Sequence, residues 1–158
     1  MTIDPAEAIA FLSHGRLAVI GASDRSDNFG TAVYRELRKR GRDVVAVNPH
    51  VAMVLGDRCY PDLASVPGDL DGAIVMVRKD QASNVVAQCI ERGVPRVWLF
   101  KGFGGVGAVS DEAVEQCERN GIDVVAGACP FMFLEPVDGL HRFHRALRRL
   151  NGSVGVAA

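Results

Sequence analysis

LAVIGASDR, residues 17–25, is the stretch of sequence that decides the fold. Its first four residues form a short apolar run, which is typical of a strand buried inside a parallel sheet. The small residues that follow predict a tight turn, and an amphipathic segment that opens at Gly30 predicts a helix after it. The backbone N–H groups at such a helix start, together with the helix dipole, favour an anion. The stretch therefore predicts an α/β sheet that holds a phosphate-bearing, nucleotide-like ligand.

Strands and helices alternate along the rest of the chain. Short apolar runs predict six strands, of which the third is the weakest, at residues 17–20, 44–47, 58–60, 73–77, 97–100 and 122–125. Capping residues and apolar spacing predict helices that begin after Asp4, near Phe29, after Asp80, after Ser110 and near Leu140. This alternation favours a doubly wound, Rossmann-like parallel sheet with the order 3-2-1-4-5-6, flanked by helices. The ligand crevice is then expected at the carboxyl ends of the first and fourth strands, where the order reverses.

Length and composition are those of a single globular domain. The chain has 158 residues, of which 48% are hydrophobic, and this is enough for one full core. We expect one domain over residues 1–150 and a disordered tail at 151–158. The net charge of -1 argues against a nucleic-acid partner. No apolar stretch approaches the ~20 residues that span a membrane.

The N-terminal segment and the cysteines indicate a cytoplasmic protein. Residues 1–15 carry two acidic residues and no basic start, which is unlike a signal peptide. The cysteines lie far apart, without C-x-x-C or zinc spacing, at Cys59, Cys89, Cys117 and Cys129. Reduced thiols are the simplest interpretation. Cys129 follows the last predicted strand, so it is either a buried apolar side chain or a thiol within reach of the ligand.

The residues after the second predicted strand restrict the ligand. A site for NAD would place a carboxylate there to bond the ribose hydroxyls. This chain has Asn48-Pro49-His50 instead, and its first turn, Gly21-Ala22-Ser23, departs from G-x-G-x-x-G. Both departures suit a ribose that carries a phosphate, as in NADP or coenzyme A. The cations near this point are His50, Arg25 and Arg42.

Five motifs together carry a resemblance to a known family: Gly21-Ala22-Ser23, Val47-Asn48-Pro49, Tyr60-Pro61-Asp62-Leu63, Val97-Trp98-Leu99 and Cys129. In these motifs, and over residues 16–136, the chain resembles the small stand-alone coenzyme A-binding domain family. That family is similar to the nucleotide-binding domain of the succinyl-CoA synthetase alpha subunit. The resemblance implies a Rossmann-like domain that binds coenzyme A, in general without an assigned reaction.

The resemblance also implies where coenzyme A would lie. Its phosphates would be lined by Gly21, Ala22, Ser23 and Arg25, its nucleotide pocket shaped by Asn48 and Pro49, its adenine bordered by Val77 and Arg78, and its pantetheine arm followed by Gly102. The chain has His50 where relatives often carry Arg or Lys, and Phe100-Lys101 where a polar pair is expected.

Three further residues complete the candidate site: Gly30 at the helix start, Lys101 in a glycine-rich loop and Cys129 in the last loop. Two of the charged candidates, Lys101 and Arg78, each have an ordinary alternative as a solvated charge.

No motif for catalysis accompanies these features. The sequence has no G-x-S-x-G, no Walker loop, no H-E-x-x-H and no metal-ligand spacing. We therefore interpret the chain as a protein that binds coenzyme A or an acyl-CoA without autonomous catalysis. Two alternatives stay open: an NAD(P)-binding oxidoreductase-like domain, and a ligase-like subunit that acts with a partner chain. A homo-oligomer is open as well.

Overall fold

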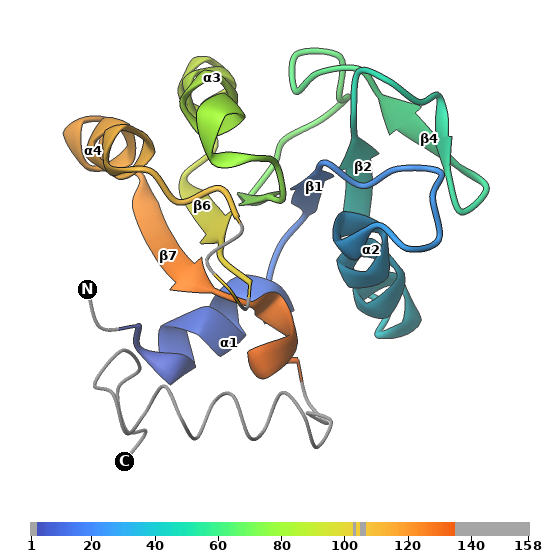
Figure 1. Cartoon of the computed structure of the whole chain (residues 1–158), viewed down its shortest axis with the longest axis horizontal. Helices are drawn as coiled ribbons and strands as arrows, with labels where there is room; N and C mark the ends of the chain where they lie inside the picture. Colours follow the sequence, from blue (N-terminus) through green and yellow to red (C-terminus); the bar gives the residue numbers. More distant parts are fainter. Residues whose placement is uncertain (1–2, 103, 105–106, 135–158) are drawn as a thin grey trace.

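The central sheet has the predicted parallel order. In the computed structural model, which describes residues 3–102, 104 and 107–134, seven strands form one sheet in the order β3-β4-β2-β1-β5-β6-β7 (Figure 1). Its parallel strands are β1 (Leu17–Ile20), β2 (Val44–Val47), β4 (Asp57–Tyr60), β5 (Gly72–Val75), β6 (Arg96–Phe100) and β7 (Asp123–Ala128). Taken alone, these strands have the order 3-2-1-4-5-6, which confirms the prediction.

One strand of the sheet, β3, is not predicted by the sequence pattern. β3 (Met53–Val54) pairs antiparallel with β4 at one edge of the sheet. The turn between them holds Leu55 and Gly56 at φ angles of 51° and 85°. Two consecutive positive φ angles belong to a type I′ hairpin turn, which usually carries Asn-Gly. Leu-Gly lacks that signal, so the hairpin is not visible in the sequence.

Helices cover both faces of the sheet. α1 (Pro5–Ser13) and α2 (Phe29–Lys39) lie on one face, and α3 (Lys79–Glu91) and α4 (Asp111–Arg119) lie on the other (Figure 1). Successive side chains of β1 point to opposite faces, as the pleat of a strand requires. Leu17 and Val19 therefore join the buried cluster with α1 and α2, whereas Ala18 and Ile20 join the cluster with α3 and α4. A strand buried on both faces explains the continuous apolar run.

The start of α3 differs from the prediction. The predicted cap, Asp80, lies in the first turn of the helix, and the N-cap is Arg78, which makes no side-chain cap bond. The reason is local, because the carboxylate of Asp80 binds the guanidinium of Arg78. The strand predicted over 73–77 also ends early, since β5 stops at Val75. The last predicted strand, 122–125, is longer than expected, because β7 runs on to Ala128.

Two predictions fall on the C-terminal part of the chain. The helix near 140–150 and the tail at 151–158 lie outside the described residues. Within the described residues, no helix has both the length and the apolar character that a membrane crossing requires.

Candidate functional site

The candidate site lies where the strand order reverses, between β1 and β5. β1 pairs with β2 on one side and with β5 on the other. The helix that follows β1 packs on one face of the sheet, and the helix that follows β5 packs on the opposite face. The two chain segments therefore part at the carboxyl ends of these strands, and this is where open α/β sheets bind their ligands.

Gly21, the first residue of the turn after β1, is required by the fold itself. Its φ angle is +101°, and a Cβ at this position would lie 2.6 Å from the carbonyl oxygen of Met76. Its N–H donates to the carbonyl of Val47 at the end of β2 (2.9 Å). The turn thus passes closely between the ends of β2 and β5, and only glycine combines that φ angle with that approach.

Gly30 and Ala22 complete the frame behind the turn. A Cβ on Gly30 would lie 3.0 Å from the backbone nitrogen of Ala22 and from the carbonyl of Gly21. Ala22 is fully buried. The first turn of α2 therefore rests directly on the turn after β1, and the predicted phosphate contacts Gly21, Ala22 and Gly30 can offer a ligand only backbone atoms.

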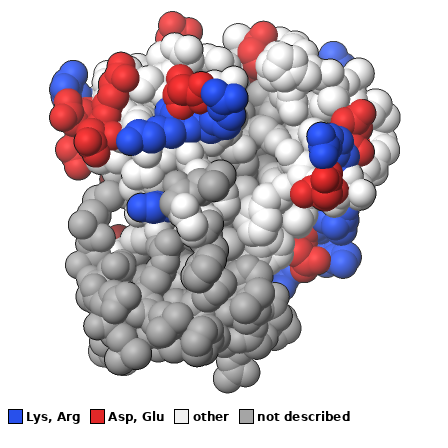
Figure 2. Space-filling view, in the orientation of Figure 1, with Lys and Arg blue, Asp and Glu red and all other residues white. Residues whose placement is uncertain are grey.

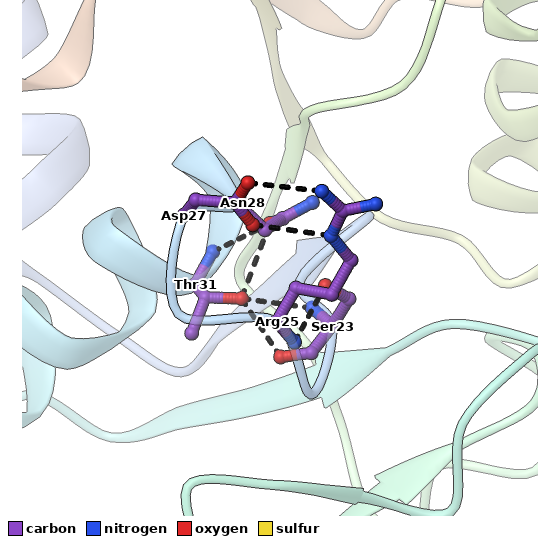
Figure 3. A network of polar contacts seen from close by, with 5 residues as sticks. All are labelled: Ser23, Arg25, Asp27, Asn28 and Thr31. Carbon is purple, nitrogen blue, oxygen red and sulfur yellow. Dashed lines mark hydrogen bonds and ion pairs between the residues drawn. The ribbon is translucent and has the colours of Figure 1, made fainter.

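A buried polar network fixes the second half of the turn (Figure 3). The N–H of Ser23 donates to the hydroxyl of Thr31 (2.9 Å), and that hydroxyl donates to the carbonyl of Ser23 (2.8 Å). Asn28 caps α2 by accepting the N–H of Thr31 (2.8 Å). Thr31 and Asn28 are not among the residues singled out from the sequence. Asn in front of a helical segment was the available signal, since Asn is a preferred N-cap.

Asn48 joins the turn after β1 to the end of β2. Its side-chain amide donates to the carbonyl of Ala22 (2.8 Å), and its side-chain oxygen accepts the N–H of His50 (2.9 Å). These bonds hold Asn48 half-buried, whereas Pro49 and His50 are exposed. Of these three predicted contacts, the structure leaves the side chains of Pro49 and His50 open to a ligand.

One arginine–aspartate pair lies in the turn after β1 and another in the turn after β5. Arg25 binds Asp27 through both ends of its guanidinium (3.1 and 2.9 Å), as Figure 3 shows. Arg78 binds Asp80 in the same way (3.1 and 2.5 Å). In each pair the hydrogen bond from arginine holds the pKa of the aspartate below its usual value. Both predicted arginine contacts therefore come with a carboxylate partner of their own.

The surface around these pairs is mixed in charge. Figure 2 shows blue and red atoms side by side in small groups, with uncharged surface between them. A hollow of about 790 Å³ lies beside Arg78, between the starts of α3 and α4, and Ser83, Asn84 and Ser110 contribute to its lining. Val77, a predicted contact that directly precedes Arg78 in the chain, is half-buried. The hollow is open, its lining carries both polar and apolar surface, and it adjoins the segment that follows β5.

The loop after β6 brings the remaining candidates to the same edge. The N–H of Lys101 donates to the carbonyl of Ala128 (3.3 Å), and Lys101 forms an isolated antiparallel bridge with Gly107. The side chain of Lys101 is exposed, and Gly102 is half-buried. Cys129 is only 9% exposed, and this burial favours the interpretation as an apolar side chain.

An aromatic cluster at this edge is a feature that sequence reasoning missed. Phe29, the first residue of α2, has its ring centroid 5.1 Å from that of Phe100 and 5.4 Å from that of Phe131. Phe100 is the last residue of β6, and Phe131 lies in the short helix η2 (Pro130–Met132) that follows β7. Three segments far apart in sequence therefore meet at the carboxyl edge of the sheet.

No group of three or more His, Cys, Asp or Glu side chains suited to a metal ion occurs among the described residues. The candidate site consists of backbone N–H groups, two paired arginines, an exposed histidine, an exposed lysine and an aromatic cluster. Groups of this kind can bind an elongated ligand with both anionic and apolar parts.

Comparison with known proteins gives matches over most of the chain. The model of the family described as "CoA binding domain" matches residues 15–135. Acetate–CoA ligase [ADP-forming] I of Archaeoglobus fulgidus is 34% identical over 118 residues, which are 72% of this chain and 17% of the ligase. The uncharacterized protein YneT of Bacillus subtilis is 28% identical over 72% of this chain and 81% of its own length.

A solved structure matches the fold as a whole. A hypothetical protein from Pyrococcus horikoshii OT3 superimposes with a TM-score of 0.75 and 25% identity, over 84% of this chain and 91% of that protein. The chain thus spans less than a fifth of the ligase but most of the two small proteins.

Proposed function

Because the chain belongs to the CoA-binding domain family, whose model matches residues 15–135, we propose that it binds coenzyme A, free or as an acyl thioester, across the switch point between β1 and β5. The observation that carries this proposal is the turn after β1. The hydroxyl of Thr31 and the backbone of Ser23 are engaged with each other, while the N–H groups of Asp24 and Ser26 donate to no acceptor within the described part of the chain. Both N–H groups lie in the turn that precedes α2, which begins at Phe29, and open backbone N–H groups of a turn can donate to an anion.

The end of β2 supports coenzyme A over NAD. Residues 48–52 carry no carboxylate that could accept the ribose hydroxyls of NAD. The exposed side chain in this segment that can carry positive charge is His50, and coenzyme A has a phosphate on its ribose. We assign His50 to that phosphate and the turn at 24–26 to the pyrophosphate. The assignment gives Arg25 and Arg78 the role of charge partners on either side of the ligand.

Calorimetric titration of the purified protein with coenzyme A, dephospho-coenzyme A and NAD tests the proposal. We expect the order of affinity to be coenzyme A, then dephospho-coenzyme A, then NAD. His50→Arg should strengthen the binding of coenzyme A at neutral pH, because arginine keeps its charge and offers a bidentate fork. The same change should leave the binding of dephospho-coenzyme A unaltered. NAD binding as tight as that of coenzyme A would contradict the assignment.

The relatives favour a second role, in which the chain serves as one part of a ligase. It matches 17% of the length of an ADP-forming acetate–CoA ligase, so the matched residues correspond to one part of such an enzyme. We propose that this chain binds coenzyme A and that a partner supplies the reaction. The purified chain with acetate, ATP and coenzyme A should then form no acetyl-CoA. Turnover by the chain alone would show autonomous catalysis and contradict this role.

A further inference from the structure

We infer that the ligand is a coenzyme A thioester with an apolar acyl group, and that this group packs on Phe29. The inference rests on the proposed function and concerns the far end of the same site. Among the described residues, three large hydrophobic side chains are exposed: Phe29, Met53 and Leu55. Met53 and Leu55 belong to the β3–β4 hairpin at the outer edge of the sheet. Phe29 alone of the three lies at the candidate site.

Phe29 is held in place although 41% of it is exposed. Its ring packs against Phe100 at 5.1 Å and against Phe131 at 5.4 Å, and Phe100 itself is buried. On the other side Phe29 precedes Gly30 and Thr31, which are locked onto the turn after β1. A ring fixed on one side and open on the other presents a ready-made apolar face, so binding there costs little ordering of the protein.

The course of the ligand across the sheet leads to this face. The ribose phosphate is assigned to the end of β2 and the pyrophosphate to the turn after β1. Neighbouring strands lie about 4.8 Å apart, and the order continues from β1 through β5 to β6. An extended ligand that starts at β2 therefore carries its thiol end toward β6, where Phe100 ends the strand and Phe29 covers it.

The chemistry of the face distinguishes a thioester from free coenzyme A. A small thiol removes little apolar surface from water, whereas an acyl chain removes more with each carbon. Each methylene fully buried against the rings should tighten binding by about threefold to fourfold. The substrate class is therefore coenzyme A thioesters whose acyl group has several carbons, rather than free coenzyme A or its acetyl ester.

Affinities for coenzyme A, acetyl-CoA, butyryl-CoA and hexanoyl-CoA, measured by calorimetry on the native protein, test the inference. We expect affinity to rise along the acyl series, by about tenfold from acetyl to butyryl. Phe29→Ala should flatten the series while the affinity for free coenzyme A changes by less than about twofold. Phe29→Leu, which keeps an apolar side chain, should give an intermediate slope.

Leu55→Ala is the matched control. Leu55 is 42% exposed, close to the exposure of Phe29, but it lies in the hairpin turn before β4, away from the carboxyl edge. It should leave the acyl series unchanged. Circular dichroism and the binding of free coenzyme A report that each variant is folded. A flat series on a native protein that binds coenzyme A, or a slope that survives Phe29→Ala, would overturn the inference alone. Absence of any coenzyme A binding would overturn the proposed function and the inference with it.

Discussion

The turn after β1 and the turn after β5 lie on either side of the switch point and are built in opposite ways. The first uses Gly21 at a positive φ angle and a buried network around Ser23 and Thr31. The second makes a backbone bond from Met76 to Ile20 (2.8 Å) and starts its helix at Arg78 without a side-chain cap. In the first turn the hydroxyl of Thr31 serves the fold, and backbone N–H groups are left for a ligand beside the exposed Arg25. In the second an exposed side chain is what a ligand can meet.

The largest expected effect comes from breaking the first turn at Gly21. Gly21→Ala places a Cβ 2.6 Å from the carbonyl oxygen of Met76 and also strains a φ angle of +101°. We expect it to lower the free energy of unfolding by at least ~3 kcal/mol. Gly41→Ala is the control, because Gly41 also has a positive φ angle but open space around it. That change should cost about 1 kcal/mol. If urea unfolding shows that the two variants lose the same free energy of unfolding, the close approach of Gly21 to Met76 is unimportant.

The next effect concerns the buried network of the first turn. Thr31→Val keeps the shape of the side chain but removes the hydroxyl that accepts from, and donates to, the backbone of Ser23. Two buried backbone groups then lose their partner, and the expected loss of stability is about 2 kcal/mol. Ser110→Ala, which removes an ordinary N-cap at α4, should cost about 1 kcal/mol. If urea unfolding shows Thr31→Val to be the milder change, the first turn does not depend on its network.

The paired carboxylates provide a smaller effect, on binding rather than stability. Asp27 and Asp80 neutralise the arginines of the two turns. Asp27→Asn or Asp80→Asn should therefore tighten the binding of coenzyme A, by about threefold at low salt and less at high salt. Asp123→Asn, at the start of β7 and thus at the opposite edge of the sheet, should have no effect. Weaker binding on removal of either carboxylate would mean that the aspartates contact the ligand themselves.

The smallest effect lies in α2, which follows the first turn. Hydrogen bonds from Arg40 and Lys39 hold the pKa of Glu36 below its ordinary value of 4.5. A carboxylate with a lowered pKa adds stability above its unfolded-state value, and that stability is lost as the pH falls through the folded-state value. Glu36→Gln should therefore destabilise the protein by about 0.5 kcal/mol at pH 7, and the difference should disappear once the pH has fallen below the folded-state pKa of Glu36. A difference that persists in acid would have to arise from packing.

The strand order could be predicted because it depends on local patterns. Apolar runs such as 17–20 and 44–47 mark strands buried on both faces, and the alternation with helices leaves few topologies. The hairpin β3–β4 and the start of α3 could not be predicted, because each depends on the geometry of a single residue or pair. Leu55 adopts a φ angle of 51°, which is uncommon for leucine and cannot be expected from the sequence. Asp80 pairs with Arg78 instead of capping the helix.

The sequence predicts a site at the switch point, but it does not predict how the residues there contact one another. Gly21 and Gly30 could be recognised as unusual, yet the contact that requires Gly21 comes from Met76, far along the chain. Thr31 shows no signal of its buried hydroxyl, because its partner is the backbone of Ser23. Phe29 resembles a core residue in the sequence, and its exposure depends on where Phe100 and Phe131 lie.

The central claim is that coenzyme A lies across the switch point, between the two turns. The most direct measurement is the change of assigned amide chemical shifts when coenzyme A is added to the native protein. We predict large, saturable changes at Asp24 and Ser26 in the first turn and at Lys79 beside the second, with Leu55 in the distant hairpin turn unchanged. Saturable changes that spare both turns and gather elsewhere would contradict the account.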